Sequence, residues 1–591
     1  MESTLRHVIA QWATDTPEAV ALASVAGDVA SYSALAELVQ GRGSDLTASG
    51  ITRGDRIAVV LPNGPHLAAA FLAVADVATA APLNPRLTSS EFEFYLSDLD
   101  AKALIVAHGD DSPSVGAAAR LGIPVMYLRP GAEGAAAFTL DGTTTGGVAA
   151  PSPAPADIAL VLHTSGTTAR PKIVPLSHAN LCVSAANVAT TLRLTPSDCC
   201  LNVMPLFHIH GLVAALLATM SAGASVVCSP GFSAPAFFRW LTESSASWYT
   251  AVPTMHQAIL ERARTGEFDS ATARLRLARS SSASLAPSII HGLEGALGVP
   301  VIESYGMTEA AHQMASNPLP PGLRKPGSVG PAAGPELAIA DEDGATLGAG
   351  AVGEVVIRGA NVTAGYHGLD DRSQHFHPGG WFRTGDQGYL DDDGYLFLTG
   401  RLKEIINRGG ETIAPREIDE VLLAVDGVRQ AVAFAVPDHA LGEEVAAAVV
   451  LEDGASLDER ELQDLAAVSL TLAKVPKRIV IVEEVPKGPT GKLQRIGLAE
   501  RLGVTGVRSE PAASPDESVL ARVQRIWQAT LELDDVGTDE PFLESGGDSL
   551  SATALAVAME DEFGIELPLL AFYRAATVRE QAALLEELGA S

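Results

Sequence analysis

A loop at residues 162–172 is rich in hydroxyl groups and could hold a phosphate. It reads Leu-His-Thr-Ser-Gly-Thr-Thr-Ala-Arg-Pro-Lys. The apolar run before it, residues 157–162, predicts a buried strand, and the Ala-rich stretch that opens at Ser177 has helical spacing. Small residues let a backbone approach an anion, hydroxyl and amide groups donate to it, and Lys172 adds charge. The loop lacks the GxxxxGK[ST] spacing, so alone it fits a Ser/Thr-rich surface turn equally well.

This loop resembles the phosphate loop of the adenylate-forming superfamily, which includes acyl-CoA synthetases, peptide-synthetase adenylation domains and luciferases. The superfamily usually has glycine at the positions of Ala169 and Ile173, so the loop departs from the pattern twice but keeps its donors. The resemblance implies that the loop binds ATP through Thr164, Ser165, Gly166, Thr167, Thr168 and Lys172.

A second motif resembles the part of the superfamily that holds the reacting phosphate and the metal. Residues 305–309, Tyr-Gly-Met-Thr-Glu, have the form of its aromatic-Gly-x-Thr-Glu motif. The resemblance implies that Tyr305 lines the nucleotide site and that Thr308 donates to the α-phosphate. It also implies that Glu309 holds Mg²⁺, a hard cation that prefers carboxylate and phosphate oxygens. Read alone, the motif would be a strand end with a partly exposed glutamate.

Two further segments resemble the ribose contacts and the hinge of the superfamily. Residues 381–386, Trp-Phe-Arg-Thr-Gly-Asp, imply that Asp386 accepts hydrogen bonds from both ribose hydroxyls, as a carboxylate can. Residues 400–403, Gly-Arg-Leu-Lys, imply that Arg401 is a second ribose contact and that Lys403 lies at the hinge of a mobile lobe. Without these neighbours, residues 394–400 would be read as a plain hairpin.

Lys492 matches the catalytic lysine of the superfamily, in the segment Pro486-Lys-Gly-Pro-Thr-Gly-Lys-Leu-Gln-Arg495. A mobile ammonium there would bridge the attacking carboxylate and the α-phosphate as charge builds in the transition state. Most lysines in Gly/Pro-rich loops are merely solvated. The flanking residues and the distance from the hinge favour the catalytic role, which Lys492 would share with Thr308 and Glu309.

His208 and His210 stand two residues apart in the segment Pro205-Leu-Phe-His-Ile-His-Gly211. This spacing puts both on one side of a strand but not of a helix. A metal pair is an alternative, although no third ligand is near in the sequence. In the superfamily this segment lines the acid pocket, and amino-acid-activating members typically carry Asp at the position of His208. The absence of Asp at this position disfavours an ordinary α-amino acid as the substrate.

Five stretches are most similar to the oxalyl-CoA synthetases of the superfamily, and they are 205–211, 248–253, 281–287, 307–312 and 316–320. Oxalate is small and has a second carboxylate, so its site needs donors and little room. We expect His208, Ser282 and His312, from three pocket-lining segments, to supply these donors, since imidazolium beside a carboxylate is electrostatically favoured. Either histidine would otherwise be a satisfied buried residue.

The last part of the chain resembles a peptidyl or acyl carrier domain. Residues 519–531 have apolar side chains at helical spacing, and Gly546-Gly-Asp-Ser-Leu550 follows. The resemblance implies that Ser549 receives 4′-phosphopantetheine from a phosphopantetheinyl transferase, at a helix N-terminus that suits a phosphodiester. From Pro515 onward there are 4 basic and 16 acidic residues, which would suit docking to basic patches on downstream enzymes. A small helical docking domain is the alternative.

The hydrophobic pattern predicts the elements that position these residues. Strands are expected at 55–61, 103–107 and 124–128 and a helix at 66–80, which indicates a mostly parallel sheet covered on both faces. Residues 131–155 are rich in Gly, Ala, Thr and Pro and are expected to be a loose connection.

Together with the resemblance, this pattern predicts an α/β and α+β fold. A large adenylate-forming N-lobe and a small mobile α+β C-lobe are followed by a four-helix carrier domain. The expected boundaries are 1–400 for the N-lobe, 401–403 for the hinge, 404–503 for the C-lobe, 504–518 for a flexible linker and 519–588 for the carrier.

The composition excludes several classes of protein. With 591 residues and 47% hydrophobic content, two or more domains with sizeable cores are expected. A net charge of −31 disfavours nucleic acid or an anionic membrane surface as the main partner. We find no secretory signal and no apolar run of the roughly 18 residues that a membrane span needs. The four cysteines form no CxxC pair, so a cytoplasmic enzyme with reduced thiols is expected.

These motifs predict an ATP-dependent ligase that activates a small carboxylic acid, with oxalate leading, and passes it to the phosphopantetheine thiol of its own carrier domain. One alternative is an acyl-CoA ligase that uses free CoA, since oxalyl-CoA synthetases do not normally carry a fused carrier domain. Another is an inactive adenylation half whose carrier is loaded by a partner. The joint presence of Glu309, Asp386, Arg401 and Lys492 disfavours the latter.

Overall fold

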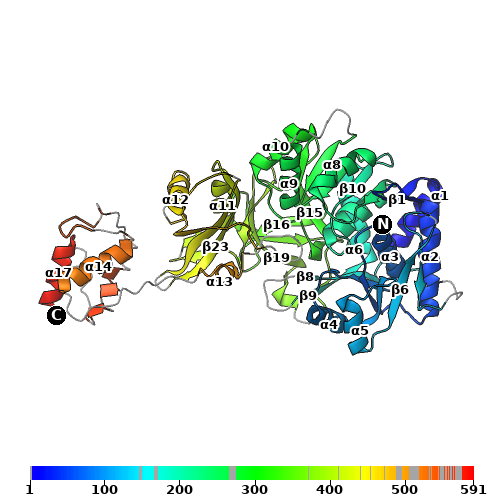
Figure 1. The fold of residues 1–591 in the computed structure, drawn as a ribbon, viewed down its shortest axis with the longest axis horizontal. Helices are drawn as coiled ribbons and strands as arrows, with labels where there is room; N and C mark the ends of the chain where they lie inside the picture. The colour runs from blue at the N-terminus through cyan, green and yellow to red at the C-terminus, as the bar shows by residue number, and fades with distance from the viewer. Residues whose placement is uncertain are drawn as a thin grey trace. The chain divides into compact units, whose positions relative to one another are not determined.

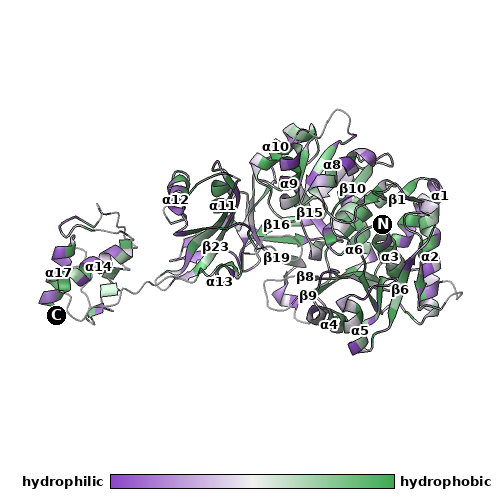
Figure 2. Ribbon diagram, in the orientation of Figure 1, coloured by the Kyte–Doolittle hydropathy of each residue, from purple (hydrophilic) through white to green (hydrophobic). Residues whose placement is uncertain are grey.

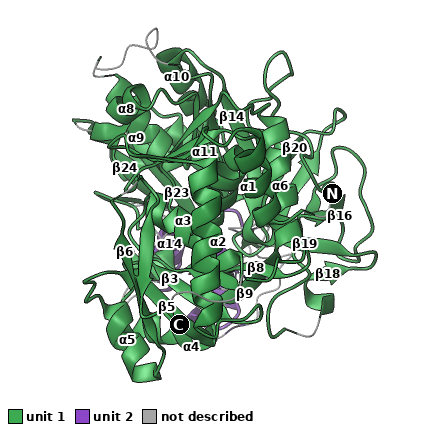
Figure 3. Ribbon diagram, turned by 90° about the vertical axis from the view of Figure 1, so that its right-hand side faces the viewer, with its two compact units in different colours: residues 1–435, 444–502 green, residues 436–443, 503–591 purple. Residues whose placement is uncertain are grey.

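In a computed structural model, the larger part of the chain folds into parallel strands covered by helices (Figure 1). The structure describes residues 3–132, 134–144, 150–164, 171–264, 266, 274–369, 372–409, 411–438, 441–452, 454–471, 473–486, 495–504, 518–531, 533, 536–542, 545, 552, 555–556, 558–559, 562–563, 565 and 575–590. The chain divides into two units, residues 1–435 with 444–502 and residues 436–443 with 503–591 (Figure 3).

The first sheet has the strand order β7-β6-β5-β3-β4-β8-β9. From β6 to β8 its strands are parallel, and β7 and β9 are antiparallel edges. Buried Val, Ile and Ala in the parallel strands explain why they lie inside the sheet. The strands are β3 (Arg56–Val60), β4 (Thr79–Pro82), β5 (Ala101–Ala107), β6 (Val125–Pro130), β7 (Phe138–Asp141), β8 (Ile158–Thr164) and β9 (Lys172–Ser177).

The second sheet has the strand order β15-β14-β13-β12-β10-β11-β1-β2, and it is parallel from β14 to β1. Because these strands run the same way, their carboxyl ends meet at one edge. The strands are β1 (Val20–Ser24), β2 (Val29–Ser31), β10 (Cys199–Asn202), β11 (Ser225–Cys228), β12 (Trp248–Ala251), β13 (Leu277–Ser280), β14 (Val301–Met307) and β15 (His312–Ser316).

Helices lie between the two sheets and outside them. α3 is buried on all sides and contacts β3 and β4 of one sheet and β1 and β11 of the other. The hydrophobic residues, green in Figure 2, gather along such inner elements. The helices are α1 (Leu5–Asp15), α2 (Tyr32–Ala48), α3 (Pro65–Ala75), α4 (Ser89–Asp98), α5 (Pro113–Leu121), α6 (His178–Thr191), η1 (His210–Leu217), α7 (Ala218–Ser221), α8 (Ala234–Glu243), α9 (Pro253–Ala263), α10 (Pro287–Leu297) and η2 (Thr308–Ala310).

A third sheet follows with the order β16-β17-β19-β18, and β20 pairs with β19. A fourth has the order β22-β21-β24-β23 with β25 beside β24, and α11 and α12 pack on it. Their elements are β16 (Glu336–Ala340), β17 (Gly353–Arg358), η3 (Arg372–Gln374), β18 (Phe376–His377), β19 (Trp381–Leu390), β20 (Leu396–Arg401), β21 (Ile406–Arg408), β22 (Glu411–Ile413), α11 (Pro415–Leu423), β23 (Val428–Asp438), β24 (Gly442–Leu451), α12 (Glu459–Ala467), β25 (Arg478–Ile481) and α13 (Leu498–Arg501).

The second unit has its own hydrophobic core between α14 (Val519–Leu531) and α17 (Val578–Glu587). Trp527 is fully buried there, its ring lies 5.0 Å from that of Phe542, and its indole nitrogen donates to Gln581 at 2.7 Å. The α/β and α+β fold class with a helical carrier region is confirmed. Whether the carrier has four helices lies outside the described residues.

Three expectations about local structure were wrong. A strand, β9, intervenes between the hydroxyl-rich loop and helix α6, so the loop joins two antiparallel strands rather than a strand and a helix. Part of the expected loose connection at 131–155 is β7, which pairs with β6. The helix expected at 66–80 ends at Ala75, because Thr79 and its neighbours form β4. In each case strand pairing decided the structure, locally in a hairpin for β9 and β7 and with more distant strands for β4.

Candidate active site

Polar side chains of three predicted segments lie where the parallel strands of the second sheet end, although His210 was not itself a predicted site residue. His210 follows β10, Ser282 follows β13, and Thr308 and Glu309 follow β14. Ligands of open α/β sheets bind outside the carboxyl ends of the strands, so this edge is the expected place for a site.

Asp386 is held by two of the residues predicted to contact the nucleotide. The hairpin of β19 and β20 places Arg401 directly opposite Asp386, and Arg401 Nε lies 3.1 Å from Asp386 Oδ1. The hydroxyl of Tyr305, from a different sheet, donates to Oδ2 of the same carboxylate. Burial raises the pKa of Tyr305, which keeps it a donor. These contacts orient a carboxylate that is only 6% exposed.

Lys172 and Glu309 are linked by Tyr366, a residue that our sequence analysis missed. Lys172 Nζ lies 4.6 Å from the centre of the Tyr366 ring, and the tyrosine hydroxyl donates to Glu309 Oε1 at 2.7 Å. Burial raises the pKa of Glu309, and the Tyr366 hydrogen bond opposes that rise. Burial and the charge of Lys403 lower the pKa of Lys172, and Glu309 raises it. Tyr366 therefore contacts both the ammonium of Lys172, through its ring, and the carboxylate of Glu309, through its hydroxyl.

Glu309 fits a divalent cation by its donor chemistry. A buried carboxylate that accepts from the Tyr366 hydroxyl and from its own backbone N–H keeps lone pairs for a metal, and phosphate oxygens would supply the remaining ligands of Mg²⁺. Within the described residues, no group of three or more His, Cys, Asp or Glu side chains is arranged to hold a metal by itself. A metal site here therefore depends on a ligand that brings its own oxygens.

The turn that carries Thr308 and Glu309 is fixed by close backbone contacts. A Cβ at Gly306 would lie 1.9 Å from the carbonyl oxygen of His312, so only glycine fits this approach. Asn361 donates from its side chain to the carbonyls of Ala310, at 2.9 Å, and of Gln313. The same turn thus sets Glu309 toward Tyr366 and His312 toward His210.

His210, not His208, is the histidine that joins the predicted acid-binding residues. His210 is fully buried, with Nδ1 3.0 Å from Ser282 Oγ and Nε2 2.6 Å from Thr250 Oγ1. The ring of His312 lies 4.9 Å from that of His210. His208 is half-buried and its Nδ1 accepts from the backbone nitrogen of His210 at 3.3 Å. The pair does not lie on a strand, because His210 begins the π-helical segment η1.

Backbone strain marks the cluster of His210, Ser282 and His312. Ser282 has φ 76°, Ala311 has φ 47° and His312 has φ 104°, a region that favours glycine. Such residues persist where the surroundings force them, often at ligand sites. The strain falls on two of the three residues that we expected to bind the acid.

The structure accounts for the remaining predicted residues in different ways. Thr164 closes the base of the hydroxyl-rich loop, since its Oγ1 donates to the Lys172 carbonyl at 3.5 Å. Lys403 is exposed beyond β20. The predicted residues that lie outside the described part are Ser165, Gly166, Thr167, Thr168, Lys492 and Ser549.

Tyr366 and His210 could have been found from limited signals. His210 was the second member of a histidine pair of which only one was chosen. Tyr366 ends a polar stretch, Asn361-Val-Thr-Ala-Gly-Tyr366, whose side chains bind the turn at 308–313. Nothing local in the sequence tells that this tyrosine reaches Glu309.

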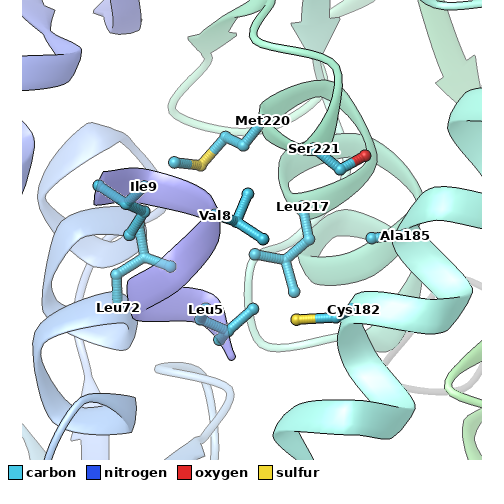
Figure 4. A pocket seen from close by; sticks show the side chains of 9 residues that line it. All are labelled: Leu5, Val8, Ile9, Leu72, Cys182, Ala185, Leu217, Met220 and Ser221. Carbon is cyan, nitrogen blue, oxygen red and sulfur yellow. The ribbon is translucent and has the colours of Figure 1, made fainter. Parts of the chain in front are cut away.

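Two cavities lie outside these clusters. One, of about 10 Å³, is apolar and lies among α1, α3, α6 and η1 (Figure 4), too small for an acid and a nucleotide. The other, of about 420 Å³, lies beside Glu303, between α10 and the loop at 317–326. Burial raises the pKa of Glu303 to about 7.

Three family models match the chain. The AMP-binding enzyme model matches residues 9–367, the AMP-binding enzyme C-terminal domain matches 417–492, and the phosphopantetheine attachment site matches 521–585. No helix in the described part of the chain is both long enough and apolar enough to cross a membrane.

Similar proteins cover most of the first two regions. A probable CoA ligase of Humulus lupulus is 46% identical over 79% of this chain and 91% of its own length. An oxalate–CoA ligase of Arabidopsis thaliana is 44% identical over 83% of this chain and 97% of its own. The crystal structure of ATP-bound MatB from Rhodopseudomonas palustris superposes with a TM-score of 0.76 at 30% identity, over 84% of this chain and 99% of that one.

Proposed function

Because this chain belongs to the family of AMP-binding enzymes and has a phosphopantetheine attachment domain, we propose that it activates oxalate, or a closely similar short acid, and loads it onto its own carrier. The general activity of the protein follows from its family. The protein is an adenylate-forming acid–thiol ligase that uses ATP with Mg²⁺, takes a carboxylic acid and bears 4′-phosphopantetheine. A phosphopantetheinyl transferase is therefore a partner.

In the first step, a carboxylate oxygen of the acid attacks the α-phosphorus of ATP. A P–O bond forms to the acid, the bond to the β-phosphate oxygen breaks, and pyrophosphate leaves. Positioned donors and positive charge do most of this work. Thr308 and Lys492 act at the α-phosphate, and Glu309 would hold Mg²⁺, which neutralises phosphate charge. The ATP contacts are Thr164, Ser165, Gly166, Thr167, Thr168, Lys172, Tyr305, Asp386 and Arg401.

The contacts of His210 are the observation that carries the choice of acid. Its ring lies 3.0 Å from the Ser282 hydroxyl and 4.9 Å from the His312 ring, a compact polar cluster rather than an apolar tunnel. Such a cluster suits a short acid with a second carboxylate, and a relative named oxalate–CoA ligase supports the same choice. Ser282, His312 and His208 remain the proposed acid contacts, with His210 added.

In the second step, the acyl group leaves AMP for the carrier thiol. When attached at Ser549, 4′-phosphopantetheine supplies a thiol at an effective concentration on the order of mM, because it is tethered. We propose that a C-lobe of 404–503 turns about Lys403 against an N-lobe of 1–400. A linker of 504–518 would join it to a carrier of 519–588. Downstream enzymes would dock on the acidic carrier, and a cytoplasmic location remains a prediction.

Two other functions compete with this proposal. An acyl-CoA ligase of the oxalate–CoA ligase type would use free CoA and keep its activity after Ser549→Ala. An inactive adenylation half would give no pyrophosphate exchange with any acid. The contact of Tyr305 and Arg401 with Asp386 favours a working nucleotide site over the inactive one.

Intact-protein mass spectrometry tests the proposal. The full chain is primed by a phosphopantetheinyl transferase and then given ATP, Mg²⁺ and a panel of short acids that includes oxalate. We expect a mass increase that matches one acid, absent in Ser549→Ala and in Lys492→Ala. No increase with any acid, together with acyl-CoA formation when CoA is added, would overturn carrier loading in favour of the CoA ligase.

A further inference from the structure

Arg279 is a buried cation next to the acid pocket. It lies on β13, has no exposed surface, and no carboxylate among the described residues pairs with it. Nη1 donates to Thr250 Oγ1 at 3.4 Å and Nη2 to Gln313 Oε1 at 3.2 Å, while Nε has no partner among those residues. Burial lowers the pKa of Arg279 to about 9. A buried charge without a counter-ion is costly, so its presence calls for an explanation.

A series of hydrogen bonds, each donated away from Arg279, leads from this cation to Ser282. A guanidinium can only donate, so Thr250 Oγ1 accepts from Arg279 and turns its own hydrogen to His210 Nε2, 2.6 Å away. His210 then carries its proton on Nδ1 and donates to Ser282 Oγ at 3.0 Å. The hydroxyl hydrogen of Ser282 is thereby directed to a further acceptor. Each bond in the chain points away from Arg279.

Resting on the proposed function, we infer that Arg279 is a positioning residue that makes the pocket select acids with a second carboxylate. Through Thr250 and His210 it fixes Ser282 as a donor, and its charge attracts an anion at the end of the substrate that does not react. In an acid with one carboxylate, that carboxylate reacts at the α-phosphorus, so the end of the acid that does not react is neutral. In a pocket without water, this difference in charge has a large effect on the binding energy.

The titratable groups around these hydrogen bonds bring no negative charge to Arg279. The titratable ones are His210 with His208 beside it, His312 on β15, and His256 on α9, whose Nε2 lies 3.1 Å from the Arg279 carbonyl oxygen. Burial lowers the pKa of His256 to about 4. None of these side chains is an acid.

Pyrophosphate exchange with paired acids tests the inference in the full-length chain. Oxalate is compared with glycolate, in which CH₂OH replaces one carboxylate. We expect Arg279→Met to lower kcat/KM for oxalate about 100-fold and to leave glycolate within about threefold, with Arg279→Lys in between. A structural role alone would lower both acids together.

A neighbouring arginine provides the matched control. Arg276 lies on the same segment and pairs with Asp198 at 2.6 Å, so Arg276→Met should leave the oxalate-to-glycolate ratio unchanged. Thr250→Val removes the middle link at nearly constant volume and should lower the ratio as Arg279→Met does. If thermal unfolding shows that Arg279→Met does not fold, Thr250→Val decides the question.

The outcomes separate this inference from the proposed function. A folded Arg279→Met or Thr250→Val variant that keeps the wild-type ratio overturns the inference. If the wild type uses neither acid, malonate with 3-hydroxypropionate and succinate with 4-hydroxybutyrate replace the pair. A preference for one of these diacids that collapses in Arg279→Met supports the inference and corrects the acid. No preference for a diacid in any pair overturns both.

Discussion

Tyr366 places its ring 4.6 Å from the ammonium of Lys172 and donates its hydroxyl to the carboxylate of Glu309 at 2.7 Å. One side chain therefore orients both the cation next to the phosphate loop and the acid proposed to hold Mg²⁺. Lys172 and Glu309 are 137 residues apart in sequence, and Tyr366 is the side chain that joins them.

Tyr366→Phe separates these two contacts, since it keeps the ring under Lys172 and removes the donor to Glu309. We expect the Mg²⁺ concentration for half-maximal pyrophosphate exchange to rise about 3- to 10-fold, because a ligand that loses its orienting hydrogen bond binds metal less well. Tyr395→Phe, which removes a hydroxyl bonded to the Leu323 carbonyl, should leave this value unchanged. Equal Mg²⁺ dependence in Tyr366→Phe and wild type would contradict the role of the hydroxyl.

Asp386→Asn removes the charge that Arg401 and Tyr305 hold in place. We expect KM for ATP to rise at least about tenfold, equal to about 1.4 kcal/mol of binding, with a smaller change in kcat. Steady-state kinetics with varied ATP give both values. Asp391→Asn, which loses a surface partner of Lys325 in the turn of the same hairpin, is the control and should leave KM near wild type. A loss confined to kcat would argue against a ribose-binding role.

His178 should make the large unit sensitive to acid. Burial lowers its pKa to about 4, and its Nδ1 accepts from the backbone nitrogen of Leu5 at 3.3 Å. The folded chain therefore binds a proton at His178 more weakly than the unfolded chain. The stability that unprotonated His178 contributes is fully present above the ordinary pKa of about 6.5 and is lost as pH falls toward about 4.

Between pH 7 and pH 5 this loss should be on the order of 2 kcal/mol, measured as the free energy of unfolding in urea. His178→Gln keeps a polar side chain there without titrating, so it should show a smaller loss over the same range. His291→Gln changes an exposed histidine on α10 and should retain the wild-type loss. An unchanged pH dependence in His178→Gln would show that other groups are responsible.

Trp527→Ala should disable the carrier without affecting adenylation, because the second unit has its own core. Loss of a fully buried tryptophan and of its bond to Gln581 should cost about 3–5 kcal/mol. We expect no mass increase from the phosphopantetheinyl transferase, while pyrophosphate exchange stays within about twofold of wild type. Leu533→Ala, at a residue that is 38% exposed, is the control and should still be primed. Parallel loss of both activities would show that the two units depend on one another.

Some of the site could be read from the sequence because its residues stand within short motifs. Asp386 and Arg401 were each predicted, and the hairpin of β19 and β20 sets them opposite one another through local pairing. The strand before the hydroxyl-rich loop was also predicted, since β8 is an apolar run with a polar loop after it. Such features depend on neighbours in the chain.

Other features were missed because the local residue pattern does not show the contacts that decide them. β9 was missed since Pro175 interrupts its alternation, and a proline is tolerated there because β9 is an edge strand. Arg279 was not among the predicted site residues. Its proposed role comes from Thr250 on β12, which it contacts, and from His210, which links Thr250 to Ser282.

The sequence by itself determined the family, the kinds of groups that act and the presence of a separate carrier region, because these follow from local motifs and from hydrophobic spacing. The tertiary structure alone decided which of those groups meet. Tyr305 reaches Asp386 across 81 residues, Tyr366 joins Lys172 to Glu309, and His210 rather than His208 joins Ser282 to His312. Parallel strands bring their carboxyl ends to one edge whatever their order in the chain, so these contacts are set by sheet packing.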